Sequence, residues 1–419
     1  MVDSTPSSEQ QETKYSVPTQ PQSTDATTGG GFERLTSFFK GISGLNMGFE
    51  EATESNEPSG NIIESKPIVI LGNHFINQDE ARDHIYSLLW LSYRCGFSPI
   101  PKSIDGPQPV TFFPSLLFSK STLTNVGNLR SLFDNENFTS DAGWGCMIRT
   151  SQNLLANALL KLAGEANGNV QLEILKLFQD DPNAAFSIHN FIRVASASPL
   201  SVKPGQWFGP NAASISIRQL TIEMTDQESP TVVPFVYISE NADLYDDEIE
   251  ETFLKEKRPL LLLFPVRLGI DHVNKYYYKS ILQLLASRFS VGIAGGKPSS
   301  SFYFIGYEND ENLIYFDPHL PQVFESPINL ASYHTLNYNK LSIEMLDPSM
   351  MIGVLLGSMS EYRELKQECT ENKIIHFHPL VTSQQDSTLN QSWEEVQEDD
   401  DFVNLTIPKS EEEFVVLNE

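Results

Sequence analysis

One cysteine in this chain, Cys146, has the surroundings of a nucleophile. It lies in SDAGWGCMIRTSQ (140–152), where small residues and two glycines, Gly143 and Gly145, lead directly into a helical pattern. A cysteine in the first turn of a helix faces unpaired backbone N–H groups and the positive end of the helix dipole. That setting favours the thiolate, which is the nucleophilic form. The alternative is a buried structural cysteine at a helix start, and this segment alone leaves both open.

A base for such a thiol is available in LIYFDPHLPQ (313–322). Alternation along a strand predicts that Asp317 and His319 share one face, with Pro318 stiffening the chain between them. A carboxylate beside an imidazole orients the ring and stabilises its charged form, as in a catalytic triad. An Asp-Pro surface turn with an incidental histidine is the alternative, and His334 is a rival base close in sequence.

Two other segments predict loops that belong near a reactive site. Gly295, Gly296 and Pro298 lie in GIAGGKPSSS (292–301), which predicts a mobile loop able to gate a cleft. The spacing of its glycines does not match a phosphate-binding loop. Trp207 stands among glycine and proline residues, so it predicts an aromatic loop tip that either caps a pocket or anchors the loop in the core.

The elements that position these residues can be outlined from periodicity. A capping pattern at Asn77 predicts a helix that ends near Gly96, and a second helix is predicted from Cys146 to Gly164. Residues 274–289 have the pattern of another helix. Four strands are predicted, at 235–238, 260–266, 301–307 and 313–316. Helices and strands mix without strict alternation, which favours an α+β fold over a doubly wound sheet.

Composition limits the class of protein. The 419 residues carry 55 acidic and 28 basic side chains, a net charge of −27, which argues against binding to nucleic acid or to anionic lipid. Three cysteines are too few for a disulfide framework and fit a reducing compartment. The sequence has neither an apolar run of about 18–20 residues nor a signal-peptide pattern, so we expect a cytoplasmic protein.

Three regions follow from the same composition. Residues 1–61 predict a disordered extension, interrupted by an apolar island at 32–42 that either forms a transient helix or docks on the body, a partner or a membrane. Residues 62–380 have a globular pattern. Residues 381–419 carry eleven acidic residues against one lysine and predict a disordered acidic tail.

Taken together, the segments resemble the autophagins, the cysteine peptidases that process the autophagy ubiquitin-like modifier. GWGCMIR and GGKP…YFIGY…YFDPH are the most specific matches. The resembling pieces keep the family's order over nearly the whole globular region: 70–75, 87–100, 140–159, 205–211, 261–277, 295–307, 313–322 and 346–353. Two departures are an apparent insertion of about 40 residues between Phe97 and Ser140, and SSSFYF where other members often carry His before the tyrosine.

The resemblance implies a papain-like α+β fold with a small accessory subdomain and a set of site residues. Cys146 matches the nucleophile, His319 the base and Asp317 the residue that orients it. Tyr93 matches the tyrosine whose hydroxyl helps the Cys146 N–H hold the oxyanion. Trp207 matches the tryptophan that covers the closed active site beside the glycine loop, where Gly295, Gly296 and Pro298 contact substrate.

The implied reactions are cleavage of the modifier after its C-terminal glycine and hydrolysis of its amide bond to phosphatidylethanolamine. No metal or other cofactor is implied. The partners are the modifier precursor and its lipid conjugate, with contact to autophagic membranes made through the substrate. We expect a monomer in the cytoplasm, transiently at pre-autophagosomal membranes and present in the nucleus by diffusion.

The tail carries two motifs in which acidic residues precede an aromatic and an aliphatic residue, Phe402 with Leu405 and Phe414 with Leu417. An extended segment of this kind can add a strand to the modifier and fill two pockets. Two rival functions remain at this stage: an inactive binding scaffold and an unrelated acyl-transfer enzyme. A metal site at Cys369, His376 and His378 is disfavoured because the spacing matches no zinc pattern.

Overall fold

The structure is a computed structural model that describes four stretches of the chain, residues 67–109, 136–164, 167–225 and 232–379. All of them belong to the unit Glu64–Glu419. The predicted extension at 1–61, its apolar island, the acidic tail and most of the apparent insertion lie outside these stretches. Among the described residues, no helix is long and apolar enough to cross a bilayer.

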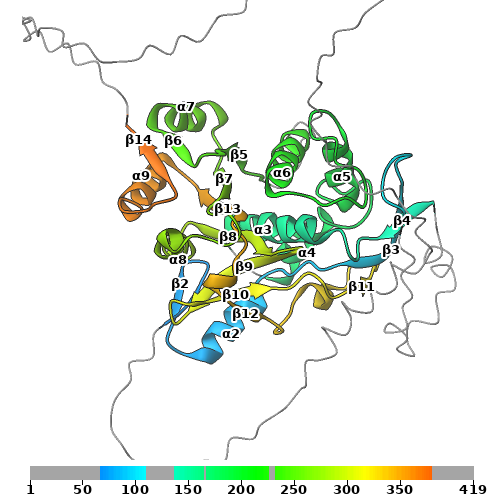
Figure 1. Ribbon diagram of the computed structural model, residues 1–419, viewed down its shortest axis with the longest axis horizontal. Helices are drawn as coiled ribbons and strands as arrows, with labels where there is room; N and C mark the ends of the chain where they lie inside the picture. The colour runs from blue at the N-terminus through cyan, green and yellow to red at the C-terminus, as the bar shows by residue number, and fades with distance from the viewer. Residues whose placement is uncertain (1–66, 110–135, 165–166, 226–231, 380–419) are drawn as a thin grey trace, which may run out of the picture. The chain divides into compact units, whose positions relative to one another are not determined.

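A mixed sheet forms the centre of this unit (Figure 1). Its strands follow in the order β12-β10-β9-β8-β13-β7-β5, and β1 with β2 extends it beside β9. All pairs are antiparallel except β5 with β7. The strands are β1 (Ile68–Ile70), β2 (Asn73–Phe75), β5 (Phe235–Ile238), β7 (Leu260–Arg267), β8 (Ser290–Lys297), β9 (Ser300–Glu308), β10 (Asn312–Phe316), β12 (Asn339–Ser342) and β13 (Ser349–Leu356).

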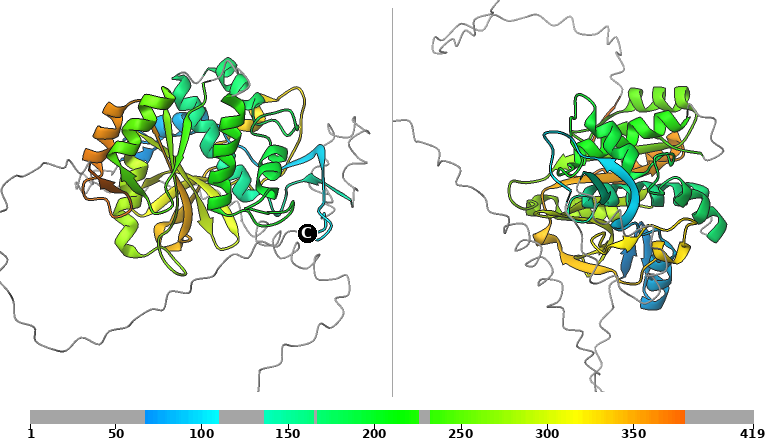
Figure 2. Two further views of the ribbon diagram at one scale, coloured as in Figure 1. Left: turned by 90° about the horizontal axis from the view of Figure 1, so that it is seen from above. Right: turned by 90° about the vertical axis from the view of Figure 1, so that its right-hand side faces the viewer.

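Helices cover both faces of the sheet (Figures 1 and 2). One hydrophobic core lies under α3 and α6, and the other lies under α8 and α9. Tyr303 and Ile305 of β9 join the first core, and Phe302 and Phe304 join the second, as alternation requires. The helices are α2 (Gln78–Ser87), α3 (Cys146–Ala163), α4 (Gly168–Lys176), α5 (Ile188–Ser196), α6 (Pro210–Thr225), α7 (Asp246–Glu256), α8 (Tyr278–Ala286) and α9 (Met359–Glu368), with the 3-10 turn η4 (Lys275–Tyr277) before α8.

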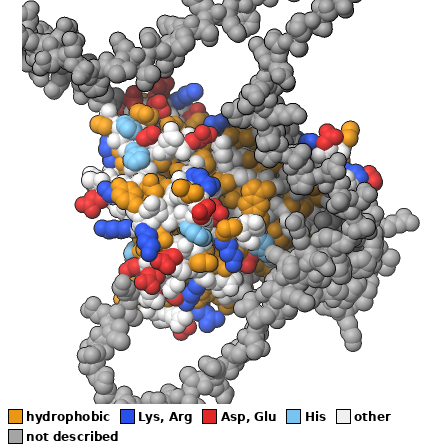
Figure 3. All heavy atoms as spheres, viewed as in Figure 1, with side chains coloured by type: hydrophobic (Ala, Val, Ile, Leu, Met, Phe, Trp, Pro, Cys, Tyr) orange, Lys and Arg blue, Asp and Glu red, His pale blue; other side chains and the backbone are white. Residues whose placement is uncertain are grey.

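Two smaller sheets complete the described fold. The first has the order β11-β3-β4 and the second pairs β14 with β6. Their strands are β3 (Arg94–Pro101), β4 (Asn137–Ser140), β11 (Gln322–Val323), β6 (Asp243–Tyr245) and β14 (His376–His378). On the face shown in Figure 3, acidic and basic side chains are interspersed among the described residues, so the net charge is not gathered there into one acidic patch.

The central helix α3 begins at Cys146, as predicted, and every residue from Cys146 to Leu160 is buried. A helix buried on all sides must satisfy its polar side chains within the protein. Gly164 ends it in the left-handed conformation, with φ of 71°. The helix therefore serves as the rigid axis from which the site is built.

The remaining element predictions can be compared directly. The four predicted strands are confirmed as β5, β7, β9 and β10, and the helix predicted at 274–289 appears as η4 followed by α8. The mixture of helix and sheet is consistent with the predicted α+β class. The helix predicted to run from Asn77 to Gly96 is wrong in its second half, because α2 ends at Ser87 and the chain continues extended into β3.

Candidate active site

Cys146 is the first residue of α3, and it is only 3% exposed. The loop before it folds around Asp141, whose backbone oxygen accepts the N–H groups of Trp144 at 3.2 Å and Gly145 at 2.9 Å. Gly143 has φ of +89°, which favours glycine, and a Cβ on Gly145 would lie 2.6 Å from the Asp141 side chain. Both glycines are therefore needed for the tight turn that presents the thiol at the helix N-terminus.

Asp317 and His319 are held together by a turn that follows β10. Asp317 Oδ1 accepts the His319 backbone N–H at 2.9 Å and lies 2.5 Å from His319 Nδ1. The indole N–H of Trp90 donates to the Asp317 backbone oxygen at 3.0 Å. The predicted adjacency of the two side chains is present, but strand alternation is not its cause. β10 ends at Phe316, and the carboxylate folds back over the Asp-Pro-His turn.

The imidazole of His319 hydrogen-bonds the Cys146 thiol, so the two residues meet in space. Burial alone would raise the pKa of that thiol, but the hydrogen bond and charge of His319, together with Ser301, outweigh it and lower the pKa. Burial would lower the pKa of His319, but Asp317 and the thiol raise it to about 9. A lowered thiol pKa beside a raised imidazole pKa favours a thiolate–imidazolium pair.

Two aromatic rings enclose the imidazole. The ring centroid of Tyr93 lies 5.3 Å from that of His319, and that of Phe302 lies 5.5 Å away, both edge-on. The Tyr93 hydroxyl also contacts the Cys146 thiol. Burial, together with the nearby Cys146 and Asp141, raises the pKa of Tyr93 well above its ordinary value. The hydroxyl therefore keeps its proton and can act as a hydrogen-bond donor beside the sulfur.

Ser301 is a site residue that sequence reasoning missed. It contacts the Cys146 sulfur through both its backbone and its side chain, and it is 2% exposed. Alternation in β9 places Ser301 on the same face as Tyr303, which is the face covered by α3. The strand prediction for 301–307 already contained this alternation, so the signal was present once the helix position was known.

The glycine segment is a strand rather than the predicted loop. Gly295 and Gly296 are buried in β8 and pair with Phe302 and Ser301 of β9. A Cβ on Gly296 would lie 1.9 Å from the Ser300 backbone oxygen, so close strand packing explains this glycine. The prediction of a mobile loop is therefore wrong for these residues. Only the exposed turn at Pro298 lies outside the two strands.

Trp207 lies in the loop before α6 and is 53% exposed, whereas its neighbour Phe208 is fully buried and packs against Phe191. The sequence left open whether this aromatic loop tip caps a pocket or anchors the loop in the core, and the two neighbouring residues differ in this respect. Phe208 anchors the loop, and Trp207 is the side chain available to contact something outside the core.

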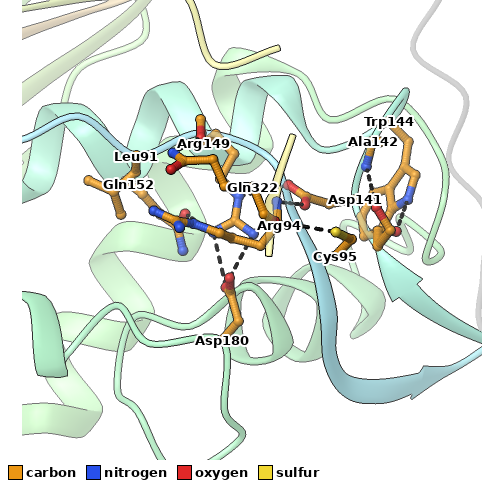
Figure 4. Close-up of polar contacts among 12 residues, drawn as sticks. Leu91, Arg94, Cys95, Asp141, Ala142, Trp144, Arg149, Gln152, Asp180 and Gln322 are labelled. Atoms are coloured by element: carbon orange, nitrogen blue, oxygen red, sulfur yellow. Dashed lines mark hydrogen bonds and ion pairs between the residues drawn. The ribbon is translucent and has the colours of Figure 1, made fainter. Parts of the chain in front are cut away.

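A separate cluster of charged side chains lies deeper along α3. Arg149 is 1% exposed and donates to Asp141 at 2.7 Å and to Asp180 at 3.0 and 2.9 Å. Figure 4 shows the guanidinium of Arg149 joined to the carboxylate of Asp180 by dashed lines. The other oxygen of Asp141 accepts the backbone N–H of Arg94 at 2.7 Å. These contacts tie together α3, the loop before Cys146, the segment that carries Asp180 and the start of β3.

The other candidate residues lie apart from this site or beyond the described stretches. His334 Nδ1 contacts the backbone oxygens of Tyr86 and Leu88, so its hydrogen bonding does not involve Asp317. His376 and His378 both approach Asp243, at 3.6 and 2.8 Å, and Cys369 is buried in the core under α9. The tail residues Phe402, Leu405, Phe414 and Leu417 lie outside the described residues.

Comparison with known proteins gives matches across this region. The peptidase C54 catalytic domain family matches residues 78–368. A cysteine protease ATG4 from Candida albicans is 62% identical over 391 residues, which cover 91% of this chain and 86% of the relative. A probable cysteine protease ATG4 from Scheffersomyces stipitis is 47% identical over 363 residues, covering 84% and 70%. One from Debaryomyces hansenii is 50% identical over 334 residues, covering 75% and 68%.

Proposed function

This chain belongs to the autophagin family, the peptidase C54 cysteine proteases, and from that premise we propose that it cleaves the autophagy ubiquitin-like modifier after its C-terminal glycine. We further propose that it hydrolyses the amide bond that joins this glycine to phosphatidylethanolamine. The chain is a cysteine peptidase, and so a hydrolase. The observation that supports the proposal most strongly is the contact between Cys146, at the start of α3, and His319, which Asp317 orients.

In the proposed reaction the Cys146 thiolate attacks the carbonyl carbon of the modifier's C-terminal glycine. His319, held as an imidazolium by Asp317, gives its proton to the amine that leaves as the C–N bond breaks. A thioester between the sulfur and the glycine remains. Water then gives a proton to His319 and attacks the thioester, and Cys146 leaves again as the thiolate. The two substrates differ only in the amine that departs.

The negative oxygen that forms during each attack requires hydrogen-bond donors. The backbone N–H of Cys146 stands at the first position of α3, where no acceptor is available within a helix. The Tyr93 hydroxyl, protonated and next to the sulfur, is the second donor in this proposal. Both donors are fixed before substrate arrives, so little reorganisation is needed during the reaction.

Selectivity for glycine is assigned to Trp207 and the β8–β9 hairpin. The half-exposed indole and the buried Gly295 and Gly296 would border a narrow channel, with Pro298 at the hairpin turn. Only a backbone without a side chain would pass through such a channel. Trp207→Ala should then relax selectivity at the cleaved residue, and unchanged selectivity in a comparison of glycine and alanine precursors would remove this assignment.

The remaining parts of the chain have roles that rest on the family resemblance. We assign the accessory subdomain to the small sheet of β3, β4 and β11, whose strands do not pair with the central sheet. The tail motifs at Phe402–Leu405 and Phe414–Leu417 would bind the modifier, so deletion of 398–419 should weaken binding while cleavage of a small glycine ester persists. A monomeric enzyme in the cytoplasm, reaching autophagic membranes through its substrate, completes the proposal.

The direct test uses a modifier precursor with several residues beyond its glycine. The full-length chain should release those residues and leave a modifier that ends in glycine, and it should free the modifier from vesicles that carry the lipid conjugate. Cys146→Ala should bind the precursor without cleaving it. Cys369→Ala is the matched control, because that cysteine is buried in the other core and should leave cleavage intact.

Three other outcomes would contradict the proposal. Binding without cleavage by the unchanged protein would indicate a scaffold. Cleavage of small thioesters but not of the precursor would indicate an unrelated acyl-transfer enzyme. Full cleavage by Cys146→Ala would exclude this sulfur as the nucleophile.

A further inference from the structure

A buried stretch of irregular backbone, residues 88–93, lies between α3 and the turn that carries Asp317 and His319. It belongs to no helix or strand, yet all six of its residues are buried. Buried backbone N–H and C=O groups must find partners inside the protein. The partners of this stretch therefore reveal which parts of the fold it connects.

On one side, two asparagines of α3 bind this backbone. Asn157 accepts the Leu89 N–H at 2.9 Å and donates to the Leu89 oxygen at 2.8 Å. Asn153 does the same for Leu91, at 2.8 Å for each bond. The four-residue interval from Asn153 to Asn157 spans about 6 Å along the helix, and the two-residue interval from Leu89 to Leu91 spans about 6.6 Å of extended chain. The two asparagines therefore have the spacing needed to bind the two leucines.

On the other side, the same stretch binds the turn of the candidate base. The Tyr93 N–H donates to the Pro318 oxygen at 2.8 Å, and the Gln322 N–H donates to the Tyr93 oxygen at 2.9 Å. The Trp90 indole donates to the Asp317 oxygen at 3.0 Å. Residues 88–93 are thus a spacer between the helix that begins at Cys146 and the turn that ends at His319.

The side-chain amide is suited to this attachment because it carries a donor and an acceptor on one planar group. A carboxylate lacks the donor, and an aliphatic side chain of similar size lacks both. Asn153 is also fully buried and donates to the Arg149 oxygen at 2.8 Å, which fixes its own orientation. The orientation of its amide is therefore fixed by α3 as well as by Leu91.

We propose that Asn153 is a positioning residue of the peptidase: by clamping Leu91 to α3 it holds Tyr93, and through Pro318 also His319, at reacting distance from the Cys146 sulfur. The proposal rests on the proposed function, since Tyr93 and His319 must act there. Asn157 makes the same pair of bonds one turn farther from the sulfur, to a residue two positions farther from Tyr93. Its loss should disturb the site much less.

The two asparagines form a matched pair for the test. Asn153→Ala and Asn157→Ala each leave one buried N–H and one buried C=O without their amide partner, so similar falls in the unfolding temperature are expected. Cleavage of the modifier precursor by the full chain is measured at a temperature at which circular dichroism shows both variants folded. We expect Asn153→Ala to lower kcat by about 30- to 100-fold with little change in KM, because misplacement of about 1 Å has effects of this order. We expect less than about a threefold loss in Asn157→Ala.

A double-mutant cycle separates positioning from general destabilisation. The part of the effect that runs through the Tyr93 hydroxyl should be absent in a Tyr93→Phe background, so Asn153→Ala should lower kcat less there than in the otherwise unchanged protein. The part that runs through the Tyr93 backbone N–H and Pro318 should persist. Should Asn153→Ala fail to fold, Asn153→Ser, whose hydroxyl can still donate or accept one hydrogen bond, enters the same cycle.

Equal losses of kcat in Asn153→Ala and Asn157→Ala would overturn the proposal. An undiminished effect in the Tyr93→Phe background, when Tyr93→Phe itself lowers kcat, would overturn the part of it that assigns Asn153 to positioning the Tyr93 hydroxyl. Failure of the proposed function gives a different result. A fully active Tyr93→Phe enzyme would remove the oxyanion role of Tyr93. The positioning role of Asn153 would then be tested by the comparison of Asn153→Ala with Asn157→Ala alone. Absence of precursor cleavage by the unchanged protein would overturn both proposals.

Discussion

Two clusters of charged side chains meet the first turns of α3, and they differ in whether a proton can move. In the deeper cluster Arg149 lies between Asp141 and Asp180, and all three residues are buried. The two carboxylates raise the pKa of Arg149 above its already high ordinary value, despite burial. The guanidinium therefore stays charged at every pH at which the protein folds, and the cluster holds together the segments that carry these side chains.

The second cluster consists of Cys146, His319 and Asp317. Its central base has a pKa of about 9, and the side chain of Asp317 is 37% exposed. A proton can therefore pass between sulfur and nitrogen in the range where enzymes work. The difference shows that buried charge alone does not make a reactive site. An ionisable pair in which one pKa is lowered and the other is raised, with access to solvent, is also needed.

The largest effect is expected from breaking the second cluster. His319→Ala should lower kcat/KM for precursor cleavage by about 10³- to 10⁴-fold, because it removes both the proton donor and the partner that stabilises the thiolate. The unfolding midpoint should fall little. Steady-state cleavage and a thermal melt measure the two effects.

His334→Ala serves as the control for this variant, since that histidine hydrogen-bonds the backbone near α2 and not the candidate site. Comparable losses of activity in both histidine variants would show that the assignment of the base is wrong.

Breaking the first cluster should affect stability instead. Arg149→Met leaves Asp141 and Asp180 buried without their partner, and the free energy of unfolding should fall by about 3–5 kcal/mol. Urea denaturation measures this loss. Arg193→Met is the comparison, because its partner Glu223 is partly exposed and the pair is worth at most about 1 kcal/mol. Similar losses for the two arginines would mean that Arg149 is not the structural tie described above.

The smallest effect is expected from Ser301→Ala, which weakens the cluster of Cys146, His319 and Asp317 without removing any of its members. Ser301→Ala removes a hydrogen bond that favours the thiolate, so the acid limb of the pH–rate profile should move to higher pH. Activity should fall about three- to tenfold at pH 6 and much less at pH 8, as the loss of one charge-assisted hydrogen bond implies. A uniform loss across that range, measured with a small glycine ester, would speak against a contact to the sulfur.

The contrast between the clusters also explains what the sequence could predict. Cys146 at a helix start and Asp317 beside His319 were visible because local spacing encodes them. The pairing of Arg149 with Asp180 could not be predicted from the sequence. The two residues lie in different parts of the chain, and they meet only because of how those parts pack.

The same reason explains the two element errors. The pattern after Asn77 is helical, but the amides of Asn153 and Asn157, which are distant in sequence, hold Leu89 and Leu91 in an extended chain. The sequence predicts a loop at Gly296 because the local residues do not indicate that this glycine pairs with β9. The need for glycine arises from the close approach of the Ser300 backbone oxygen. In both places tertiary contacts overrode local preference.

The state of the Cys146 sulfur at rest tests the central claim most directly. The rate of alkylation by iodoacetamide should be measured against pH, in the unchanged protein and in His319→Ala. Cys95 and Cys369, whose pKa burial raises to about 12, should stay unmodified near neutral pH. We predict that Cys146 reacts rapidly at pH 6–7, where an ordinary thiol with a pKa of about 8.5 is mostly protonated, and that the variant loses this reactivity. An ordinary thiol titration that is the same in both proteins would contradict the thiolate–imidazolium pair.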